Sequence, residues 1–283
     1  SSPPKRWIYE VEGRRMRKHE LEIIAGFAVS ILTTRLEAEL LDELDEFTRR
    51  ARIRIMTNGV DSEYFQAAPA ETVGSKVIRL PLRNTREGVS KPRMVFTGAM
   101  DYYANIEAVT WFATEVFPQI RQQQPLAEFL IVGSNPTAEV KKLGAQPGIT
   151  VTGTVEDVRP YLREAAVCVA PLRIARGIQN KVLEAMACGK AVVATPQAAT
   201  GLRIAHEEQV LLASSPADFA AAVIQLLRDD SLRENLGWRA RRFVELEHQW
   251  HPILQNFVEL LESTGQRKTK TETHNVRIIA RGQ

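Results

Sequence analysis

The sequence is poor in cysteine and histidine and lacks any long apolar run. Its 283 residues include two cysteines and five histidines. Cys168 and Cys188 fall in a predicted strand and a predicted helix, so they indicate neither a disulfide framework nor a zinc site. A membrane span needs about 18 successive apolar residues, and the first residues show no apolar stretch typical of a signal peptide. These absences favour a cytoplasmic globular protein.

A strong excess of one charge is also lacking. The chain has 37 Lys and Arg against 34 Asp and Glu, a net charge of +3. Residues 263–283 alone carry five Lys and Arg and one Glu, a net of +4, which leaves −1 for all the rest. A nucleic-acid-binding domain carries its positive excess within the fold. We therefore expect no nucleic-acid partner, and we expect residues 263–283 to form a basic, disordered tail.

Three common ligand-binding motifs are absent as well. No G-x-G-x-x-G follows a predicted strand, which argues against a dinucleotide site. Gly189 and Lys190 are followed by Ala191 rather than by the Ser or Thr of a phosphate-binding P-loop. No G-x-S-x-G is present, which argues against a nucleophile elbow.

The sequence does contain a regular alternation of short apolar segments and helical patterns after residue 92. Such alternation predicts a parallel α/β sheet with helices on both faces, over residues 93–262. One helical pattern runs from Ile106 to Ile120, and Pro118 is expected to kink or end it. Another is expected to begin with Ser215 as its cap and Pro216 at its first position. The predicted strands are Met94–Gly98, Phe129–Gly133, Ile149–Gly153, Val167–Leu172, Ala191–Thr195 and Val210–Ala213.

The part of the chain before this domain divides in two. Residues 1–57 have the pattern helix, strand, helix, strand, and Thr34 with Glu37 three positions on predicts a capping box at the start of the second helix. Residues 58–92 begin at a turn signal and then become polar and irregular, which is typical of a linker.

The segment Ala170–Thr195 carries the clearest chemical signal. It has the pattern of a buried strand, a loop, a helix and a second strand, and Gly177 is expected to open the helix. Arg173, Arg176 and Lys181 flank the first turn of this helix, where each cation is unfavourable by about 0.3–1 kcal/mol against the helix dipole. A bound anion would make the interaction of these cations with the helix end favourable instead of unfavourable. The free N–H groups, the glycine and the three cations therefore predict a phosphate or diphosphate site.

Glu184 is the second unusual residue of this segment. It lies in the most apolar part of the predicted helix, where a carboxylate must be paired or must face a ligand. Its two acceptor oxygens suit the neighbouring hydroxyls of a ribose. The alternative is structural: Glu184 caps a nearby backbone group or pairs with Lys181, three positions earlier.

These residues also carry a family resemblance. GIQNKVLEAMACGKAVVAT resembles the donor-binding motif of retaining GT-B glycosyltransferases of family four, also called group 1. IRIMTNGVDSEYF, MVFTGAMDYYANIEAVTWFATEVFPQI and FLIVGSNP extend the resemblance along the chain, and they are most similar to sugar transferases that accompany exosortase and exopolysaccharide gene clusters. The implied fold is a Rossmann-like parallel sheet with helices on both faces, the C-terminal domain of a GT-B enzyme, preceded by a partial N-terminal domain.

The resemblance implies an activity and a set of site residues. The domain binds a nucleoside-diphosphate sugar and passes the sugar, with retention, to a hydroxyl of a saccharide or lipid-linked acceptor in polysaccharide or glycoconjugate biosynthesis. It needs no metal and no cofactor beyond the donor substrate. Glu184 is expected to hold the ribose, and Gly98 to let the backbone approach the donor. The remaining implied residues are Arg173 and Lys181 in catalysis, Arg176, Gly177, Ile178, Gln179 and Asn180 at the diphosphate, and Gly153, Thr154 and Val155 against the base.

The chain also departs from the family pattern. Arg176 stands where many members have a glutamate that touches the donor sugar, so the identity of the donor sugar stays open. Residues 1–57 match only the end of the N-terminal acceptor domain, so we expect little or no activity from this chain without a missing domain or an oligomer partner. Two alternatives stay open: a non-catalytic nucleotide-sugar-binding module, and a GT-B sugar-nucleotide epimerase. Peripheral contact with the inner membrane face also stays open, although acidic residues interleave with the basic ones near the N-terminus.

Overall fold

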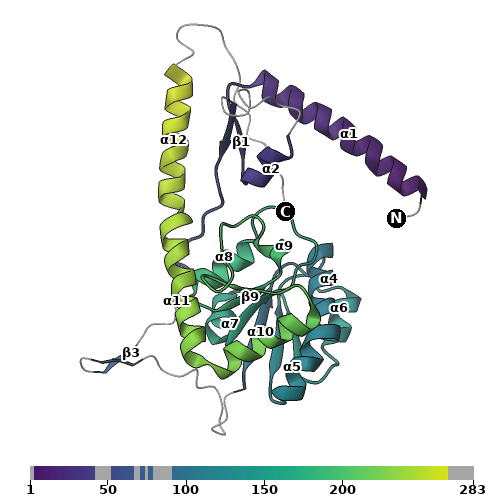
Figure 1. Cartoon of the computed structure of the whole chain (residues 1–283), viewed down its shortest axis with the longest axis vertical. Helices are drawn as coiled ribbons and strands as arrows, with labels where there is room; N and C mark the ends of the chain where they lie inside the picture. The colour runs from purple at the N-terminus through teal and green to yellow at the C-terminus, as the bar shows by residue number, and fades with distance from the viewer. Residues whose placement is uncertain (1–2, 42–51, 67–70, 74–75, 79–90, 267–283) are drawn as a thin grey trace. The chain divides into compact units, whose positions relative to one another are not determined.

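The chain folds into two compact units. The computed structural model describes residues 3–41, 52–66, 71–73, 76–78 and 91–266. The larger unit is Gly59–Gln249, and the smaller one combines Ser1–Asn58 with Trp250–Gln283 (Figure 1).

The larger unit is built on a six-stranded sheet in which all paired strands are parallel. The strand order is β10-β9-β8-β5-β6-β7, so the chain runs outward from β5 in one direction and then returns to build the other half from β8. The predicted strands are all present, and their ends lie within two residues of the predicted ones. The strands are β5 (Arg93–Thr97), β6 (Glu128–Val132), β7 (Ile149–Gly153), β8 (Val167–Ala170), β9 (Val192–Ala194) and β10 (Leu211–Leu212).

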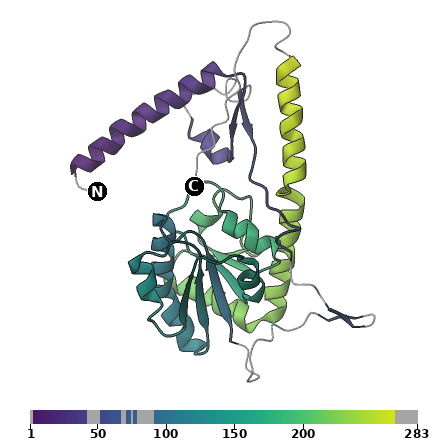
Figure 2. The same cartoon turned by 180° about the vertical axis from the view of Figure 1, so that it is seen from behind.

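Helices cover both faces of this sheet, as the α/β prediction requires (Figure 2). η1 and α5 pack with α10, and α8 packs with α11. α4 contacts α10 through the rings of Trp111 and Phe219, whose centroids are 5.8 Å apart. Ser215 caps α10 by accepting a hydrogen bond from the backbone of Asp218, and Pro216 is the first helical residue, as predicted. The helices are α4 (Tyr103–Trp111), the π-helix η1 (Phe112–Val116), α5 (Phe117–Gln123), α6 (Ala138–Leu143), α7 (Arg159–Glu164), α8 (Asn180–Ala187), α9 (Pro196–Ala199), α10 (Pro216–Arg228) and α11 (Asp230–Glu247).

Pro118 explains why the predicted helix from Ile106 to Ile120 is divided into three segments. Proline has no N–H and its ring clashes with the preceding turn of an α-helix. The chain widens into the π-helix η1 just before Pro118, and the N–H of Phe117 bonds to the carbonyl of Phe112, five residues earlier. The irregularity expected at Pro118 thus takes the form of a π-helical segment just before the proline, and the chain continues into α5 instead of ending its helix there.

A cluster of aromatic rings forms the core between this divided helix and the sheet. Phe112 is fully buried. Its ring centroid lies 4.5 Å from that of Phe129 and 5.7 Å from that of Phe219. Phe117 lies 6.0 Å from Phe129 in the same cluster. These rings therefore form the core on the face of the sheet that carries α4, α5 and α10.

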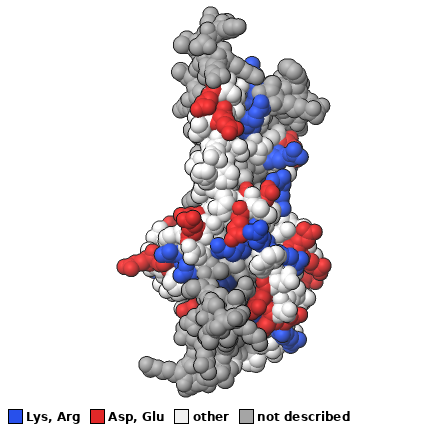
Figure 3. Space-filling view, turned by 90° about the vertical axis from the view of Figure 1, so that its left-hand side faces the viewer, with Lys and Arg blue, Asp and Glu red and all other residues white. Residues whose placement is uncertain are grey.

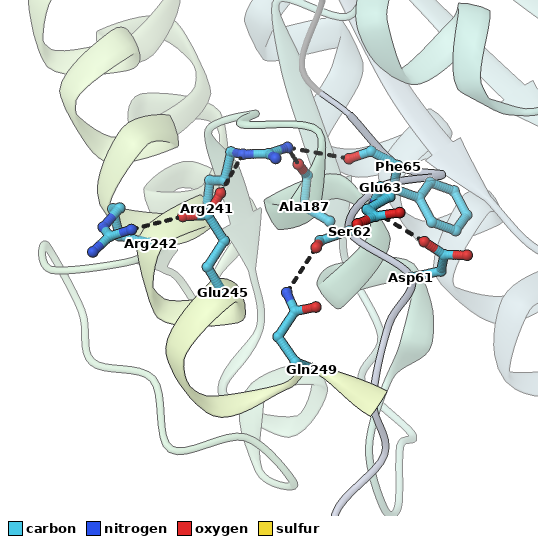
Figure 4. Close-up of polar contacts among 9 residues, drawn as sticks. All are labelled: Asp61, Ser62, Glu63, Phe65, Ala187, Arg241, Arg242, Glu245 and Gln249. Carbon is cyan, nitrogen blue, oxygen red and sulfur yellow. Dashed lines mark hydrogen bonds and ion pairs between the residues drawn. The ribbon is translucent and has the colours of Figure 1, made fainter. Parts of the chain in front are cut away.

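Residues 59–66, the first part of the predicted linker, belong to the larger unit and contact its last helix (Figure 4). The N–H of Val60 bonds to the carbonyl of His248, and Ser62 accepts a 2.7 Å hydrogen bond from Gln249. Arg241 of α11 donates to the carbonyl oxygens of Phe65 and Ala187.

The remainder of the predicted linker contains a short hairpin. It is a two-stranded antiparallel pair, β3 (Glu71–Val73) and β4 (Lys76–Ile78). The rest of 67–90 lies outside the described residues, so the prediction of an irregular linker is tested only where the chain is described.

The smaller unit contains the predicted helix–strand–helix–strand pattern. Its capping box is confirmed: Thr34 accepts a hydrogen bond from the N–H of Glu37, whose carboxylate accepts the N–H of Thr34 at 3.0 Å. Residues 42–51 lie outside the described residues, as do residues 267–283 of the predicted tail. The elements are α1 (Pro3–Gly26), β1 (Ser30–Leu32), α2 (Arg35–Glu39), β2 (Ile53–Ile55), parallel to β1, and α12 (Trp250–Gln266).

Basic and acidic residues alternate along α1 and pair with one another. Arg6 pairs with Glu10 at 3.0 Å, and Lys18 with Glu22 at 3.9 Å. These side chains are highly exposed, so each pair stabilises the helix only slightly. The pairing agrees with the interpretation of α1 as an ordinary solvated helix.

The aromatic cluster gives a prediction about stability. Phe112→Ala should lower the free energy of unfolding of the larger unit by about 3–5 kcal/mol, because it leaves a cavity among packed rings. Leu126→Ala is the matched control, since Leu126 is 53% exposed, and it should change stability by less than about 0.5 kcal/mol. Urea unfolding of both variants measures this, and equal effects would contradict the assigned core.

Candidate functional site

The site lies where the two halves of the sheet meet. β5 pairs with β8, with Met94 opposite Val167, while β6 and β9 lie on the outer sides of this pair. Open α/β sheets bind ligands at the carboxyl ends of the strands, at the point where the strand order reverses. The loops after β5 and β8 flank that point.

The loop after β8 reaches α8 through a left-handed turn at Gly177, whose φ is +67°. The helix begins at Asn180 with Gln179 as its N-cap, three residues later than predicted. Gly201 packs against this turn so closely that a Cβ on it would lie 2.4 Å from the carbonyl oxygen of Gly177. The turn at Gly177 and its contact with Gly201 place the helix start later than predicted. This tertiary contact is not visible in the local sequence pattern. The side chain of Gln179 makes no capping hydrogen bond to the helix end.

Lys181, in the first turn of α8, extends toward the loop after β5. Its ammonium donates a 3.1 Å hydrogen bond to Oδ1 of Asn105 in α4, and it lies 5.3 Å from the centroid of the Phe96 ring. Burial lowers the pKa of Lys181 from 10.5 to about 8, while the nearby Glu184 carboxylate opposes this change. The structure thus places one largely desolvated cation at the carboxyl ends of β5 and β8.

Glu184, one turn further along α8, is not engaged in the pairing that was the structural alternative. Among the described residues no ion pair within 4.0 Å joins it to Lys181, although the two charges attract each other. Burial raises the pKa of Glu184, and Lys181 counteracts that rise. Its carboxylate oxygens therefore remain available to a ligand with hydroxyl donors.

Arg173, in the loop after β8, is held by an acidic partner from α4. Its Nε donates to Glu107 Oε1 at 2.6 Å, its Nη2 contacts the same oxygen, and its guanidinium lies 5.2 Å from the Trp111 ring. Glu107 was not among the predicted site residues, although an acid among Ile106, Ala108 and Val109 is the same kind of signal as Glu184. The cluster of three cations is thus partly neutralised.

The glycines of the site allow close backbone approach. A Cβ on Gly98 would lie 2.8 Å from Nδ2 of Asn105 and 3.4 Å from Cε of Lys181. A Cβ on Gly133 would lie 1.6 Å from the carbonyl oxygen of Gly98, so the loops after β5 and β6 also touch. Gly98, Asn105 and Lys181 therefore form one packed group.

The loop expected to contact the base lies further along the sheet. Gly153 ends β7 with a φ of +73°, Thr154 is exposed and Val155 is half-buried. β7 is the edge strand, separated from β5 by β6. Ile178 and Gln179 are half-buried and Asn180 is exposed at the start of α8.

Two further features are absent from the described part of the chain. It has no group of three side chains suited to a metal ion, and none of its helices is long and apolar enough to cross a membrane.

Comparison with known proteins agrees with this architecture. The family model described as "Glycosyl transferases group 1" matches residues 91–229, a range that contains the six strands of the sheet together with α8. An uncharacterized glycosyltransferase of Methanocaldococcus jannaschii is 24% identical over 228 residues, which are 77% of this chain and 55% of that protein. The chain spans about half the length of the curated relatives it matches.

Solved structures show the same fold. Sucrose-phosphate synthase from Thermosynechococcus elongatus matches with a TM-score of 0.63 and 21% identity, over 84% of this chain and 58% of that one. HepE from Anabaena, in complex with UDP, matches with a TM-score of 0.65 and 14% identity, over 83% of this chain and 64% of that one. The fold is that of GT-B glycosyltransferases, and residues 91–229 are similar to the group 1 glycosyltransferases.

The burial of Lys181 predicts a pH dependence of stability. Above pH 8 the folded chain releases a proton that the unfolded chain, with a lysine pKa of 10.5, still holds. Stability therefore rises with pH, by about 1 kcal/mol between pH 8 and 9 for this group. Well below pH 8 both states hold the proton and the contribution is constant.

Urea unfolding of the wild type and of Lys181→Met at pH 7, 8 and 9 tests this prediction. The free energy of unfolding of the wild type relative to Lys181→Met should change little below pH 8. Between pH 8 and 9 it should rise. The series stops at pH 9 because unfolded thiols, with a pKa of 9.0, are already half ionised there. A difference that is the same at all three pH values would contradict the assigned burial of the ammonium.

Proposed function

We propose that this chain is the donor-binding part of a retaining group 1 glycosyltransferase, which binds a nucleoside-diphosphate sugar between the loops after β5 and β8. One observation carries the proposal: Lys181 and Glu184 lie one turn apart on α8 yet are not ion-paired, so each is available to a different part of a ligand. A carboxylate with two acceptor oxygens suits the two ribose hydroxyls. An ammonium near a helix N-terminus suits a diphosphate.

The charged groups of the site fit the needs of sugar transfer. When the bond between the sugar and the diphosphate breaks, negative charge grows on the leaving phosphate oxygen. Lys181 and the N-terminus of α8, with Gly177, Ile178, Gln179 and Asn180 leading into it, stabilise that charge in the transition state. Gly98 and the Gly153–Val155 loop both lie at the carboxyl ends of the parallel strands. In this proposal they accommodate the rest of the donor.

Arg173 and Arg176 complete the diphosphate site in this proposal. Arg176 is exposed in the loop that leads to the start of α8, and our proposal assigns its guanidinium to the phosphate oxygens held there. Arg173 is already fixed by Glu107 and by the Trp111 ring, which orients its guanidinium and reduces the entropy lost on binding. Because these cations neutralise the diphosphate, the proposed transfer involves no metal ion.

UDP is the first nucleotide to test. HepE, whose fold this chain shares, is described in complexes with UDP and with UDP-glucose. The acceptor in our proposal is a saccharide or lipid-linked hydroxyl of exopolysaccharide biosynthesis on the cytoplasmic side of the membrane. Most of the acceptor pocket then corresponds to the part of the relatives that this chain does not cover.

α12 offers an apolar surface for that additional part. Trp250, Leu254 and Val258 are spaced four residues apart, so they share one side of the helix, and they are 43%, 48% and 50% exposed. Residues 250–258 carry no Lys, Arg, Asp or Glu; Figure 3 shows a white stretch along this part of α12 with acidic side chains beside it. We propose that this side of α12 packs against the rest of the acceptor domain.

The donor site predicts a specific loss of nucleotide affinity. Glu184→Ala should weaken UDP binding at least about tenfold, because it removes a charged acceptor of two ribose hydrogen bonds. Glu234→Ala is the matched control, since Glu234 is an exposed glutamate of α11, and it should leave the affinity unchanged. Isothermal titration calorimetry with UDP, GDP and ADP measures the affinities and identifies the base.

Equal affinity of the wild type and Glu184→Ala for every nucleotide would contradict the proposal. Tight binding by the longer protein without transfer to any acceptor would favour a non-catalytic nucleotide-sugar-binding module. Interconversion of free nucleotide sugars would favour the epimerase.

A further inference from the structure

Asn105 is a buried side chain whose two polar atoms are both used. The residue is 4% exposed. Its Nδ2 donates to the carbonyl oxygen of Ala99 at 2.9 Å, and its Oδ1 accepts from the ammonium of Lys181 at 3.1 Å. A carbonyl oxygen only accepts and an ammonium only donates, so the amide fits in a single orientation. Asn105 thereby joins the loop after β5 to α8.

Without this amide, Lys181 has an obvious alternative partner. Lys181 and Glu184 are three positions apart on α8, a spacing at which opposite charges meet on a helix surface. They attract each other in this structure without forming an ion pair among the described residues. The hydrogen bond to Asn105 directs the ammonium toward Gly98 and away from Glu184.

Glu184 is the one charged neighbour of Lys181 among the described residues. Phe96 and Gly98 contact it from β5 and its loop. Thr97 of β5 and Cys168 of β8 line the same small internal space, and burial raises the pKa of the Cys168 thiol to about 12, which keeps it neutral. Glu184 is thus the charged group that affects the ammonium.

We propose that Asn105 is a positioning residue that keeps Lys181 apart from Glu184, so that the diphosphate and the ribose of the donor each meet their own charged group. The roles of Lys181 and Glu184 in donor binding rest on the function proposed above. The arrangement of the three side chains does not depend on that function and is tested without any ligand.

The ligand-free test measures the pKa of Lys181 in Asn105→Leu, from the ¹³Cε chemical shift of a lysine-labelled chain assigned with Lys181→Met. Loss of the amide alone removes a hydrogen bond from the ammonium and lowers its pKa, whereas movement onto Glu184 raises it. We expect a rise of about 1 pH unit or more, and no rise when Glu184→Gln is added. An unchanged or lower pKa in Asn105→Leu would overturn the proposal.

The ligand test uses UDP and uridine. In Asn105→Leu the Lys181–Glu184 pair should weaken binding of both by about tenfold. Adding Lys181→Met should restore uridine binding, because Glu184 is released, but not UDP binding. Loss of both ligands without this selective rescue would mean that Asn105 acts only in folding, and would overturn the proposal. If Asn105→Leu does not fold, Asn105→Ala removes the same amide without a larger side chain and is interpreted in the same way.

The two proposals fail in distinguishable ways. A raised pKa of Lys181 in Asn105→Leu with no UDP binding by the wild type would support the positioning role and contradict the donor site. UDP binding that depends on Glu184 with an unchanged pKa of Lys181 would support the donor site and contradict the positioning role.

Discussion

The pairing of β5 with β8 is the constraint on which the rest of the larger unit depends. Residues 98–166 lie between these two strands in the chain, yet the strands are neighbours in the sheet. Because consecutive parallel strands need crossover connections, the sheet grows to one side from β5 and to the other side from β8. The loops after these two strands are brought together at the reversal point, and the charged residues of the candidate site are placed relative to them.

Backbone contacts between glycines set how closely the loops of the site approach. Gly133 lies directly against Gly98, and Gly201 against Gly177. A side chain at Gly133 or Gly201 would force the neighbouring backbone to move, since the Cβ would fall at 1.6 Å or 2.4 Å from a carbonyl oxygen. These contacts support the loops after β5 and β8 before any ligand binds, and such preorganisation favours binding and charge stabilisation.

The charges of the site are distributed among partners from different elements. Arg173 is held by Glu107, Lys181 by Asn105, and Glu184 keeps its carboxylate available. The partners Glu107 and Asn105 belong to α4, the helix after β5. Arg173, Lys181 and Glu184 belong to the loop and the helix after β8. The geometry of the site is therefore a property of the β5–β8 pair rather than of either segment alone.

The elements and the unusual residues were predictable from the amino-acid sequence alone. Alternating patterns predicted the six strands, Thr34 and Pro216 marked helix starts, and Glu184 was identified as a carboxylate in an apolar setting, because these signals depend on neighbours within a few positions. Tertiary contacts account for the start of α8 at Asn180, the pairing of Arg173 with Glu107, and the choice of Asn105 over Glu184 as the partner of Lys181. Those partners lie 66 and 76 residues apart in the chain, and a local pattern contains no information about which distant side chains the sheet brings together.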